Sequence, residues 1–237
     1  MIEASAVSKN FGRRKVLDSI DMRISDGEIV ALIGPNGSGK TTLIRVLSTL
    51  LQPSGGDVSL DGRSAFDDPV ISRKSIGVVG HSTYSYDDLT ALENLRFYWS
   101  MYGLPGGEFD RTAPNLLKRV GLGHRMNDRA GVLSRGMRQR LSIARAVMHS
   151  PKVLLLDEPF SSLDQKGVDI LSQILRDERA RGCSVLVVSH DIQRISEFAD
   201  RADVLTRGRI EQSYGSGAIK RGDLEAGYRR SYEGDGA

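Results

Sequence analysis

The sequence contains one cysteine, one tryptophan and no long run of apolar residues. With only Cys183, the chain cannot form an internal disulfide, and this composition suits a reducing compartment. Cys183 opens an apolar stretch at 183–188, so we expect a buried structural thiol. No run approaches the roughly 20 apolar residues of a membrane span, and the first residues lack the apolar core of a signal peptide. We therefore expect a cytoplasmic protein that reaches a membrane only through a partner.

The charge balance of the chain is nearly even. Its 237 residues carry a formal net charge of +3, with 39% hydrophobic and 27% charged residues. That composition is ordinary for a globular protein, and the length suffices for one large α/β domain or a domain with a sub-domain. A charge of +3 does not by itself indicate nucleic acid. It fits partner docking, an anionic membrane or a nucleotide equally well.

The glycine-rich stretch GPNGSGKTT, residues 34–42, is the strongest signal in the sequence. An apolar, β-branched segment at 28–33 precedes it, and apolar residues at helical spacing follow it. Such a loop points successive N–H groups inward at a helix N-terminus and so forms an anion site. The pattern G-x-x-x-x-G-K-[ST] predicts a bound nucleoside triphosphate, although kinases, GTPases and motors share it. The expected nucleotide-binding residues are Gly34, Pro35, Asn36, Gly37, Ser38, Gly39, Lys40, Thr41 and Thr42.

Two side chains of this loop have expected chemical roles. Lys40 can reach the β- and γ-phosphates, which makes it a candidate catalytic residue as well as a binding residue. The Thr41 hydroxyl can bind Mg²⁺.

The order of the predicted elements indicates an α/β fold. Residues 2–7 and 16–24 predict an antiparallel pair of strands around a turn at Gly12. Further along, strands alternate with helices, which indicates a largely parallel sheet with right-handed crossovers. We therefore predict a P-loop NTPase core over 1–215, with an N-terminal antiparallel β sub-domain. Other predicted strands lie at 57–60, 75–79, 152–158, 184–189, 204–206 and 209–210, and helices at 42–51, 167–179 and 192–198.

Residues from about 88 to 150 predict an inserted α-helical sub-domain. The segment from Thr90 to Glu93 has the form of a capping box, and further helices are predicted at 111–120 and 136–148. The Met, Trp and Tyr residues at 98–102 are predicted to pack in the local core, with a partner-docking surface as the alternative. After residue 216 we expect a C-terminal tail, either a short helix at 223–232 or disordered.

Two acidic residues close the apolar strand VLLLDE. Asp157 can hold Mg²⁺ opposite Thr41, and Glu158 can polarise a water for in-line attack on a γ-phosphate. A helix cap or a solvated turn is the plainer interpretation, but an apolar strand that ends in two acids needs compensation such as a metal. His190 ends another predicted strand. Because ligands of open parallel sheets bind at the carboxyl ends of the strands, these residues and the loop point to one site.

The segment LSRGMRQ, residues 133–139, begins the predicted helix at 136–148. Ser134 suits an N-cap, which is a frequent need of a helix. The other interpretation is a second anion site, in which a serine hydroxyl, glycine N–H groups and the helix dipole face one phosphate. Both can hold together.

LSRGMRQ resembles the LSGGQ signature of the ATP-binding-cassette ATPases, which power ABC transporters. The phosphate loop, VLLLDEP, the segment 161–164 and His190 follow in that family's order, and the resemblance covers roughly residues 2–212. It implies that ATP is the nucleotide and that Glu158 is the catalytic base. It further implies roles for five residues: Phe11 stacks on adenine, Asp164 belongs to the D-loop, His190 senses the γ-phosphate, and Ser134 and Gly136 contact ATP held by a partner subunit. From spacing alone, Phe11 is equally a hairpin aromatic that packs on the sheet.

One departure from the family concerns His81, which stands where a glutamine is usual. Imidazole can ligate a metal but does not copy the geometry of an amide, so a direct Mg²⁺ contact from His81 is not part of the predicted metal set. Within the family, GH at this position, DDLTALENLRFYWSMYGL and LSRGMRQRLSIARAV look most like the ATP-binding subunit of the haem exporter of cytochrome c maturation. Drug- and polysaccharide-exporter ATPases look similar.

The resemblance also implies an assembly. The family's site needs a phosphate loop and a signature from opposite subunits, and this chain has one of each. We expect a homodimer in the ATP state, or a pair with a paralogous cassette, on an integral membrane permease at the cytoplasmic face of the cell membrane. No nucleic-acid partner is expected. The alternative is a soluble ATP switch of DNA repair or translation, but the long coiled-coil insertion and the second cassette of those proteins are not present.

Overall fold

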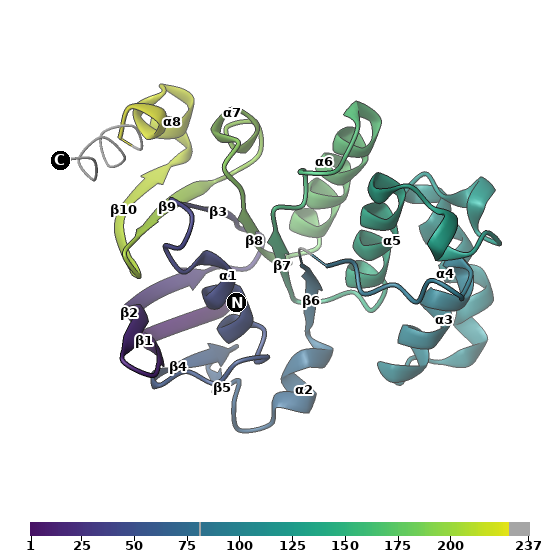
Figure 1. The fold of residues 1–237 in the computed structure, drawn as a ribbon, viewed down its shortest axis with the longest axis horizontal. Coiled ribbons are helices and arrows are strands. Elements are labelled where there is room, and N and C mark those ends of the chain that lie inside the picture. The colour runs from purple at the N-terminus through teal and green to yellow at the C-terminus, as the bar shows by residue number, and fades with distance from the viewer. Residues whose placement is uncertain (81, 228–237) are drawn as a thin grey trace.

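The computed structural model describes residues 1–80 and 82–227, and these residues build two β-sheets and a set of helices (Figure 1). The smaller sheet is antiparallel in the order β2-β1-β4-β5. It contains β1 (Ile2–Phe11), β2 (Arg14–Ile24), β4 (Gly55–Leu60) and the short β5 (Arg63–Ser64). The predicted N-terminal antiparallel pair is confirmed, but β1 runs on to Phe11.

The larger sheet has the order β10-β9-β3-β8-β7-β6. All of its neighbouring pairs are parallel except β10 with β9. Every residue of β3, β7 and β8 is buried, which explains why their sequences are continuously apolar. The sheet confirms the predicted α/β fold. Its strands are β3 (Ile29–Ile33), β6 (Ile76–Val79), β7 (Val153–Asp157), β8 (Ser184–Val188), β9 (Arg201–Thr206) and β10 (Arg209–Gly215).

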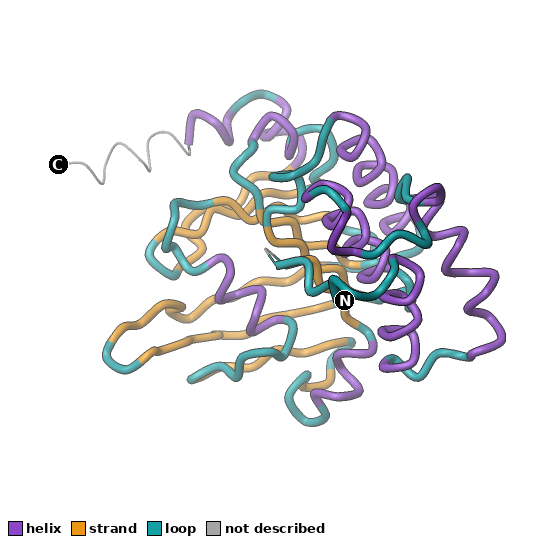
Figure 2. The backbone as a smooth tube through the Cα atoms, turned by 45° about the vertical axis from the view of Figure 1, so that its right-hand side comes forward, coloured by secondary structure: helices purple, strands orange, loops and turns teal. Residues whose placement is uncertain are grey.

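The helices lie mostly to one side of the strands, and Figure 2 shows this separation. Within residues 1–80 and 82–227, no helix has both the length and the apolar character that crossing a bilayer requires. The helices are α1 (Lys40–Leu47), α2 (Pro69–Lys74), α3 (Ala91–Met101), α4 (Gly106–Arg119), α5 (Arg135–Val147), α6 (Gln165–Ala180), α7 (Ile192–Ile195) and α8 (Ser216–Lys220), with 3₁₀ turns at Gly123–Arg125 and Ala130–Val132.

The larger sheet separates two hydrophobic clusters. Along β3, Ile29 and Ala31 face one cluster, which includes α3 to α6, and Val30 and Leu32 face the other, around α1 and the antiparallel sheet. This division follows from the alternation of side chains along a strand. It leaves α1 packed between the two sheets, with the phosphate loop at its start.

The helical region agrees with its predicted cap. The Thr90 hydroxyl accepts from the Glu93 N–H at 3.1 Å, and the Glu93 carboxylate accepts from the Thr90 N–H at 2.8 Å. Trp99 is buried with its ring edge on Phe109, as predicted for the local core, but Met101 is 67% exposed. The core prediction is therefore wrong at Met101, because two residues along a helix turn the side chain by about 200°.

Several predicted boundaries are wrong for local reasons. α1 ends at Leu47, not near residue 51, because Thr49 takes a positive φ of 58°. α4 starts at Gly106, five residues before its predicted start, directly after Pro105. α7 ends at Ile195, β9 and β10 are longer than predicted, and α2 and β5 have no counterpart in the prediction.

The C-terminal tail packs on the core as far as it is described. Residues 223–227 are helical, and the rest of the predicted helix at 223–232 lies outside the described residues. Ile219 of α8 and Leu224 are both buried in the cluster that includes α3 to α6.

Candidate active site

The phosphate loop runs from the end of β3 to the start of α1. Gly39, the N-cap of α1, has a φ of 113°, and a Cβ atom there would lie 2.9 Å from both Val16 O and Leu17 Cδ2. Only glycine has the conformation and the size that this position needs. The sequence motif therefore matches a physical requirement, namely the close packing of β2 against the loop.

The turn between β9 and β10 supports the loop from a distant part of the chain. The Gly208 N–H donates to Ser38 O at 3.1 Å, and the Asp18 N–H donates to Gly208 O at 2.9 Å. Among the described residues, the Ser38 hydroxyl is buried without a hydrogen-bond partner. Buried polar groups are nearly always satisfied, so an oxygen-rich anion held by the loop amides suits this position.

Lys40 is held against the same loop. Its ammonium donates to Gly34 O at 2.7 Å and to Pro35 O at 2.9 Å. Burial lowers the pKa of Lys40, and the negative charges of Glu158 and Asp157 partly oppose that effect. The positive charge thus sits where the loop converges, as a phosphate-binding role requires.

Thr41 and Asp157 meet at the carboxyl end of β7. The Thr41 hydroxyl donates to Asp157 Oδ2 at 2.8 Å, and Asp157 is only 6% exposed. The two oxygen groups are the kind that Mg²⁺ prefers. No group of three or more His, Cys, Asp or Glu side chains suited to a metal occurs among residues 1–80 and 82–227. A hydroxyl and a carboxylate 2.8 Å apart fit a cation that also takes ligands from water and a bound phosphate.

Glu158 and His190 form a second pair next to the first. Glu158 has a left-handed φ of 49°, and its N–H donates to Val188 O at 2.9 Å. A non-glycine residue in this region costs roughly 1–3 kcal/mol, and such strain concentrates at functional sites. Glu158 Oε2 lies 3.0 Å from His190 Nδ1. The pair places a carboxylate and an exposed imidazole at adjacent strand ends.

A cavity of about 350 Å³ joins the phosphate loop to Asp157 and Glu158, whereas His190 is not among its described lining residues. It shows that loop residues and both acids share one space, and that β2 also contributes to its wall. We did not predict Arg14 or Val16, because no motif marks them. Its lining residues are Arg14, Val16, Asn36, Gly37, Gly39, Lys40, Thr41, Thr42, Asp157 and Glu158.

Phe11 lies at the end of β1, opposite Arg14 in the strand register. Its ring is 50% exposed, and Lys9 Nζ lies 5.4 Å from the ring centroid. The exposed ring leaves a face available for stacking, so adenine binding at Phe11 stays a prediction. His81, the possible metal ligand, lies outside the described residues.

The signature residues do not join this cavity. Ser134 caps α5 by accepting from the Met137 N–H at 3.2 Å, as predicted for an N-cap. Gly136 lies so close to the segment after β7 that a Cβ atom there would be 2.7 Å from Ser162 O. Neither Ser134 nor Gly136 is among the described residues that line the phosphate-loop cavity. Figure 1 shows α5 apart from α1. Asp164, which is also not in the lining, caps α6 by accepting from the Gly167 N–H at 2.9 Å.

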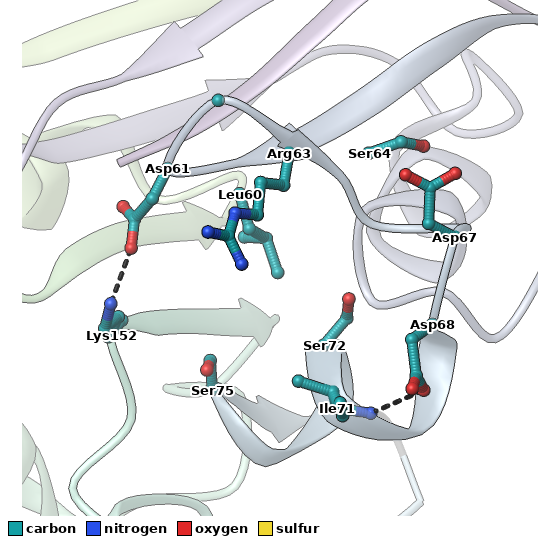
Figure 3. A pocket seen from close by; sticks show the side chains of 11 residues that line it. Leu60, Asp61, Arg63, Ser64, Asp67, Asp68, Ile71, Ser72, Ser75 and Lys152 are labelled. Atoms are coloured by element: carbon teal, nitrogen blue, oxygen red, sulfur yellow. Dashed lines mark hydrogen bonds and ion pairs between the residues drawn. The ribbon is translucent and has the colours of Figure 1, made fainter.

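A larger hollow of about 870 Å³ lies at the opposite ends of the strands. Figure 3 shows it between Arg63, α2 and the Asp61–Lys152 ion pair, whose charged atoms are 2.6 Å apart. Ser75 and Lys152 in its wall precede β6 and β7, so the hollow is at the amino ends of parallel strands. Because ligands bind at the carboxyl ends of such sheets, the candidate active site is the smaller cavity.

Comparison with known proteins assigns the family. The model of the ABC transporter family matches residues 17–161, which is more than half of the chain. The chain is 34% identical to "ABC transporter ATP-binding protein NatA" of Bacillus subtilis (strain 168), covering 91% of this chain and 92% of the relative. It is 38% identical to "Glutamine transport ATP-binding protein GlnQ" of Escherichia coli (strain K12), covering 90% of both.

A solved structure also superposes on the fold. It is described as the "Dimeric structure of a post-hydrolysis state of the ATP-binding cassette MJ0796 bound to ADP and Pi". It matches with a TM-score of 0.81 and 30% identity, over 91% of this chain and 99% of that one. Sequence, fold and site geometry agree, and the chain therefore belongs to the ATP-binding-cassette ATPases of ABC transporters.

Proposed function

We propose that two copies of this chain, or one copy and a paralogous cassette, close on two ATP–Mg²⁺ and open after hydrolysis, and that this cycle drives a membrane transporter. One observation carries the proposal: Ser134 and Gly136 are absent from the described lining of the cavity that contains Lys40. A second chain related by a two-fold axis would supply them, and would receive the same residues in return. The dimeric form of the MJ0796 cassette supports this arrangement.

In this proposal the loop residues bind and orient the triphosphate. The N–H groups of the non-proline residues from Gly34 to Thr42 and the Lys40 ammonium hold its oxygens, and the ring of Phe11 stacks on adenine. Thr41 and Asp157, already 2.8 Å apart, would hold Mg²⁺, which would supply positive charge beside the phosphates when bound.

Glu158 acts as the general base. Its carboxylate accepts a proton from the water that attacks the γ-phosphorus, and His190, 3.0 Å away, orients that carboxylate and donates to the γ-phosphate. The strained backbone of Glu158 turns its side chain away from the buried strand and into the cavity with Lys40. Asp164 holds the start of α6 close to the signature segment, through Ser162 and its contact with Gly136.

Closure of the dimer depends on ATP because Ser134 and Gly136 gain phosphate contacts only in the closed state. A ligand shifts an equilibrium by its difference in affinity for the two states. ATP therefore favours the closed dimer, and loss of the γ-phosphate favours opening.

The partner that receives this movement is, in our proposal, an integral membrane permease, with this chain bound peripherally at the cytoplasmic face. A groove of about 360 Å³ beside the loop after β6 has a mostly aromatic and aliphatic lining. Tyr84 and Leu50 in that lining are 64% and 61% exposed. Exposed apolar groups that line a groove are typical of an interaction site. We propose that it receives an apolar segment of the permease.

The cargo in our proposal is haem exported for cytochrome c maturation. The support is the resemblance of residues 80–104 and 133–147 to that branch. A drug or polysaccharide exporter is the alternative within transport. GlnQ is named for glutamine transport and the name of NatA gives no cargo, so family membership alone does not select a cargo.

The test of the proposed function uses Glu158→Gln. We expect ATP hydrolysis to fall by about 10²–10⁴-fold, because general-base catalysis contributes about that much. ATP-dependent dimers should accumulate in size-exclusion chromatography with light scattering. Glu197→Gln, an exposed glutamate just after α7, is the matched control and should hydrolyse ATP like the parent. Monomers of Glu158→Gln at saturating ATP–Mg²⁺ would contradict the proposal. Copurification with a polytopic membrane protein tests the transport role.

A further inference from the structure

Arg145 of α5 holds the loop that follows β6. Its guanidinium donates to Thr83 O at 2.8 Å and Tyr84 O at 3.3 Å, and to Val78 O on β6 at 3.5 Å. One side chain thus joins α5, the loop and the edge strand. The planar, multidentate guanidinium suits such a junction better than an ammonium does.

Aromatic side chains complete the junction. The guanidinium carbon lies 4.8 Å from the ring centroid of Tyr98 and 5.8 Å from that of Tyr84. The Tyr98 hydroxyl donates to Tyr84 O at 2.7 Å. Tyr84 itself has a left-handed φ of 51°, a conformation that costs free energy and persists only when surrounding contacts impose it. Arg145 and Tyr98 supply those contacts.

The other end of the loop belongs to α3. The Asn94 side chain accepts from the Tyr86 N–H at 2.8 Å and donates to Tyr86 O at 3.0 Å. The described part of the loop, residues 82–86, is therefore tied to two helices. Among these contacts, Arg145 is the side chain of α5 that reaches the loop.

Arg145 lies near the C-terminal end of α5, and the signature residues Ser134 and Gly136 lie at the N-terminal end of the same helix. Gly77 of β6 lies so close to the C-terminal end of α5 that a Cβ atom there would be 2.2 Å from Ala146 O. That end is consequently fixed, whereas Ser134 caps the other end, eleven residues before Arg145. At 1.5 Å per residue the separation is about 16 Å. A small tilt at Arg145 becomes a larger displacement of Ser134 and Gly136.

We propose that Arg145 is a positioning residue that couples the groove to the signature, so that a partner seated against Tyr84 and Tyr98 changes how α5 presents Ser134 and Gly136 to the opposite ATP. Arg145 lines both the groove and its small continuation beside Asn94. The inference rests on the proposed function, because it needs a signature that acts on a second subunit.

A matched control lies on the same helix. The Arg140 guanidinium also donates to two carbonyls, Val120 O at 3.4 Å and Gly121 O at 3.5 Å, but these follow α4 and not the loop after β6. Arg140→Lys and Arg145→Lys both remove guanidinium–carbonyl contacts from α5, although those of Arg145 are more numerous and include a shorter one. Only the second removes contacts to the loop.

The test measures dimerisation in the Glu158→Gln background as a function of protein concentration at saturating ATP–Mg²⁺. We expect Arg145→Met to raise the midpoint concentration at least about tenfold, within the usual range of coupling between sites. Arg145→Lys should give an intermediate value, and Arg140→Lys a value within about twofold of the parent. Monomer affinity for a fluorescent ATP analogue should stay unchanged, because Arg145 is not in the described cavity lining around Lys40.

Hydrogen exchange provides a second readout that a merely structural role would not change. In the parent, ATP-dependent closure should alter protection of the amides at 82–86. Arg145→Lys should weaken that response and Arg145→Met should abolish it, whereas Arg140→Lys should keep it. Equal dimerisation of Arg145→Lys and the parent would overturn the inference. So would an equal loss in Arg145→Lys and Arg140→Lys. If the Glu158→Gln parent stays monomeric, the proposed function itself fails first, and this inference falls with it.

Discussion

Substituting Gly39 by alanine tests whether packing of β2 against the phosphate loop positions the nucleotide. An alanine at φ 113° pays for a conformation that L-residues rarely adopt, about 1–3 kcal/mol. Its Cβ atom would also lie 2.9 Å from Val16 O and Leu17 Cδ2, and overpacking of this kind costs about 1–3 kcal/mol more. We expect a total destabilisation of about 2–6 kcal/mol.

Gly37→Ala separates the two causes. Gly37 has a φ of 81°, but an added Cβ would meet no described atom within 4 Å. This variant should therefore lose only the conformational part, about 1–3 kcal/mol. Gly182→Ala, at a φ of 84° with equally open surroundings in the described residues, is a control between α6 and β8, away from the loop, and should bind ATP like the parent.

Urea unfolding followed by far-ultraviolet circular dichroism gives the stability differences, and a fluorescent ATP analogue gives affinity. We expect Gly39→Ala to lose more stability than Gly37→Ala. If the loop relaxes to relieve the contact, Gly39→Ala should instead lose ATP affinity, because the N–H groups no longer converge. A Gly39→Ala variant with the stability of Gly182→Ala and the ATP affinity of the parent would refute the reasoning.

Three further outcomes are expected. Burial lowers the pKa of His149 from 6.5 to about 4. At a pH between these two values, the unfolded chain therefore binds a proton that the folded chain does not. The free energy of unfolding should consequently fall by about 2 kcal/mol as the pH is lowered from about 8 to 5. His149→Phe keeps an aromatic ring against Tyr102 and should flatten that pH dependence, as measured by urea titrations. Burial raises the pKa of the Cys183 thiol to about 12, so a disulfide reagent at about pH 8 should label the chain only after unfolding, and rapid labelling of the folded chain would contradict the structure. Thr41→Ala removes a hydroxyl that donates to Asp157 and should weaken binding of ATP in the presence of Mg²⁺ by about 10–100-fold. The loss should be smaller when the metal is chelated. Equal losses with and without Mg²⁺ would argue against a metal role for Thr41.

Local patterns predicted the parts of the fold that depend on neighbouring residues. The strand, glycine-rich loop and helix around residues 28–47 could be read from alternation, glycine placement and helical spacing. The capping box at Thr90 was equally local, and the structure confirms it. Boundaries were less predictable: β1 continues past residue 7 because β2 and β4 pair with it, and no local pattern reports such pairing.

The sequence by itself determined that the chain holds a nucleotide-binding loop, two acids at a strand end and a signature helix, because each is a contiguous pattern. Only the tertiary structure decided that Thr41 meets Asp157, that the β9–β10 turn supports Ser38, and that Arg145 joins α5 to the loop after β6. These contacts join residues 62 to 170 positions apart, and they form because strand order and sheet register bring distant segments together. The same topology keeps Ser134 and Gly136 out of the described lining of their own chain's phosphate cavity, a relation that no stretch of sequence contains.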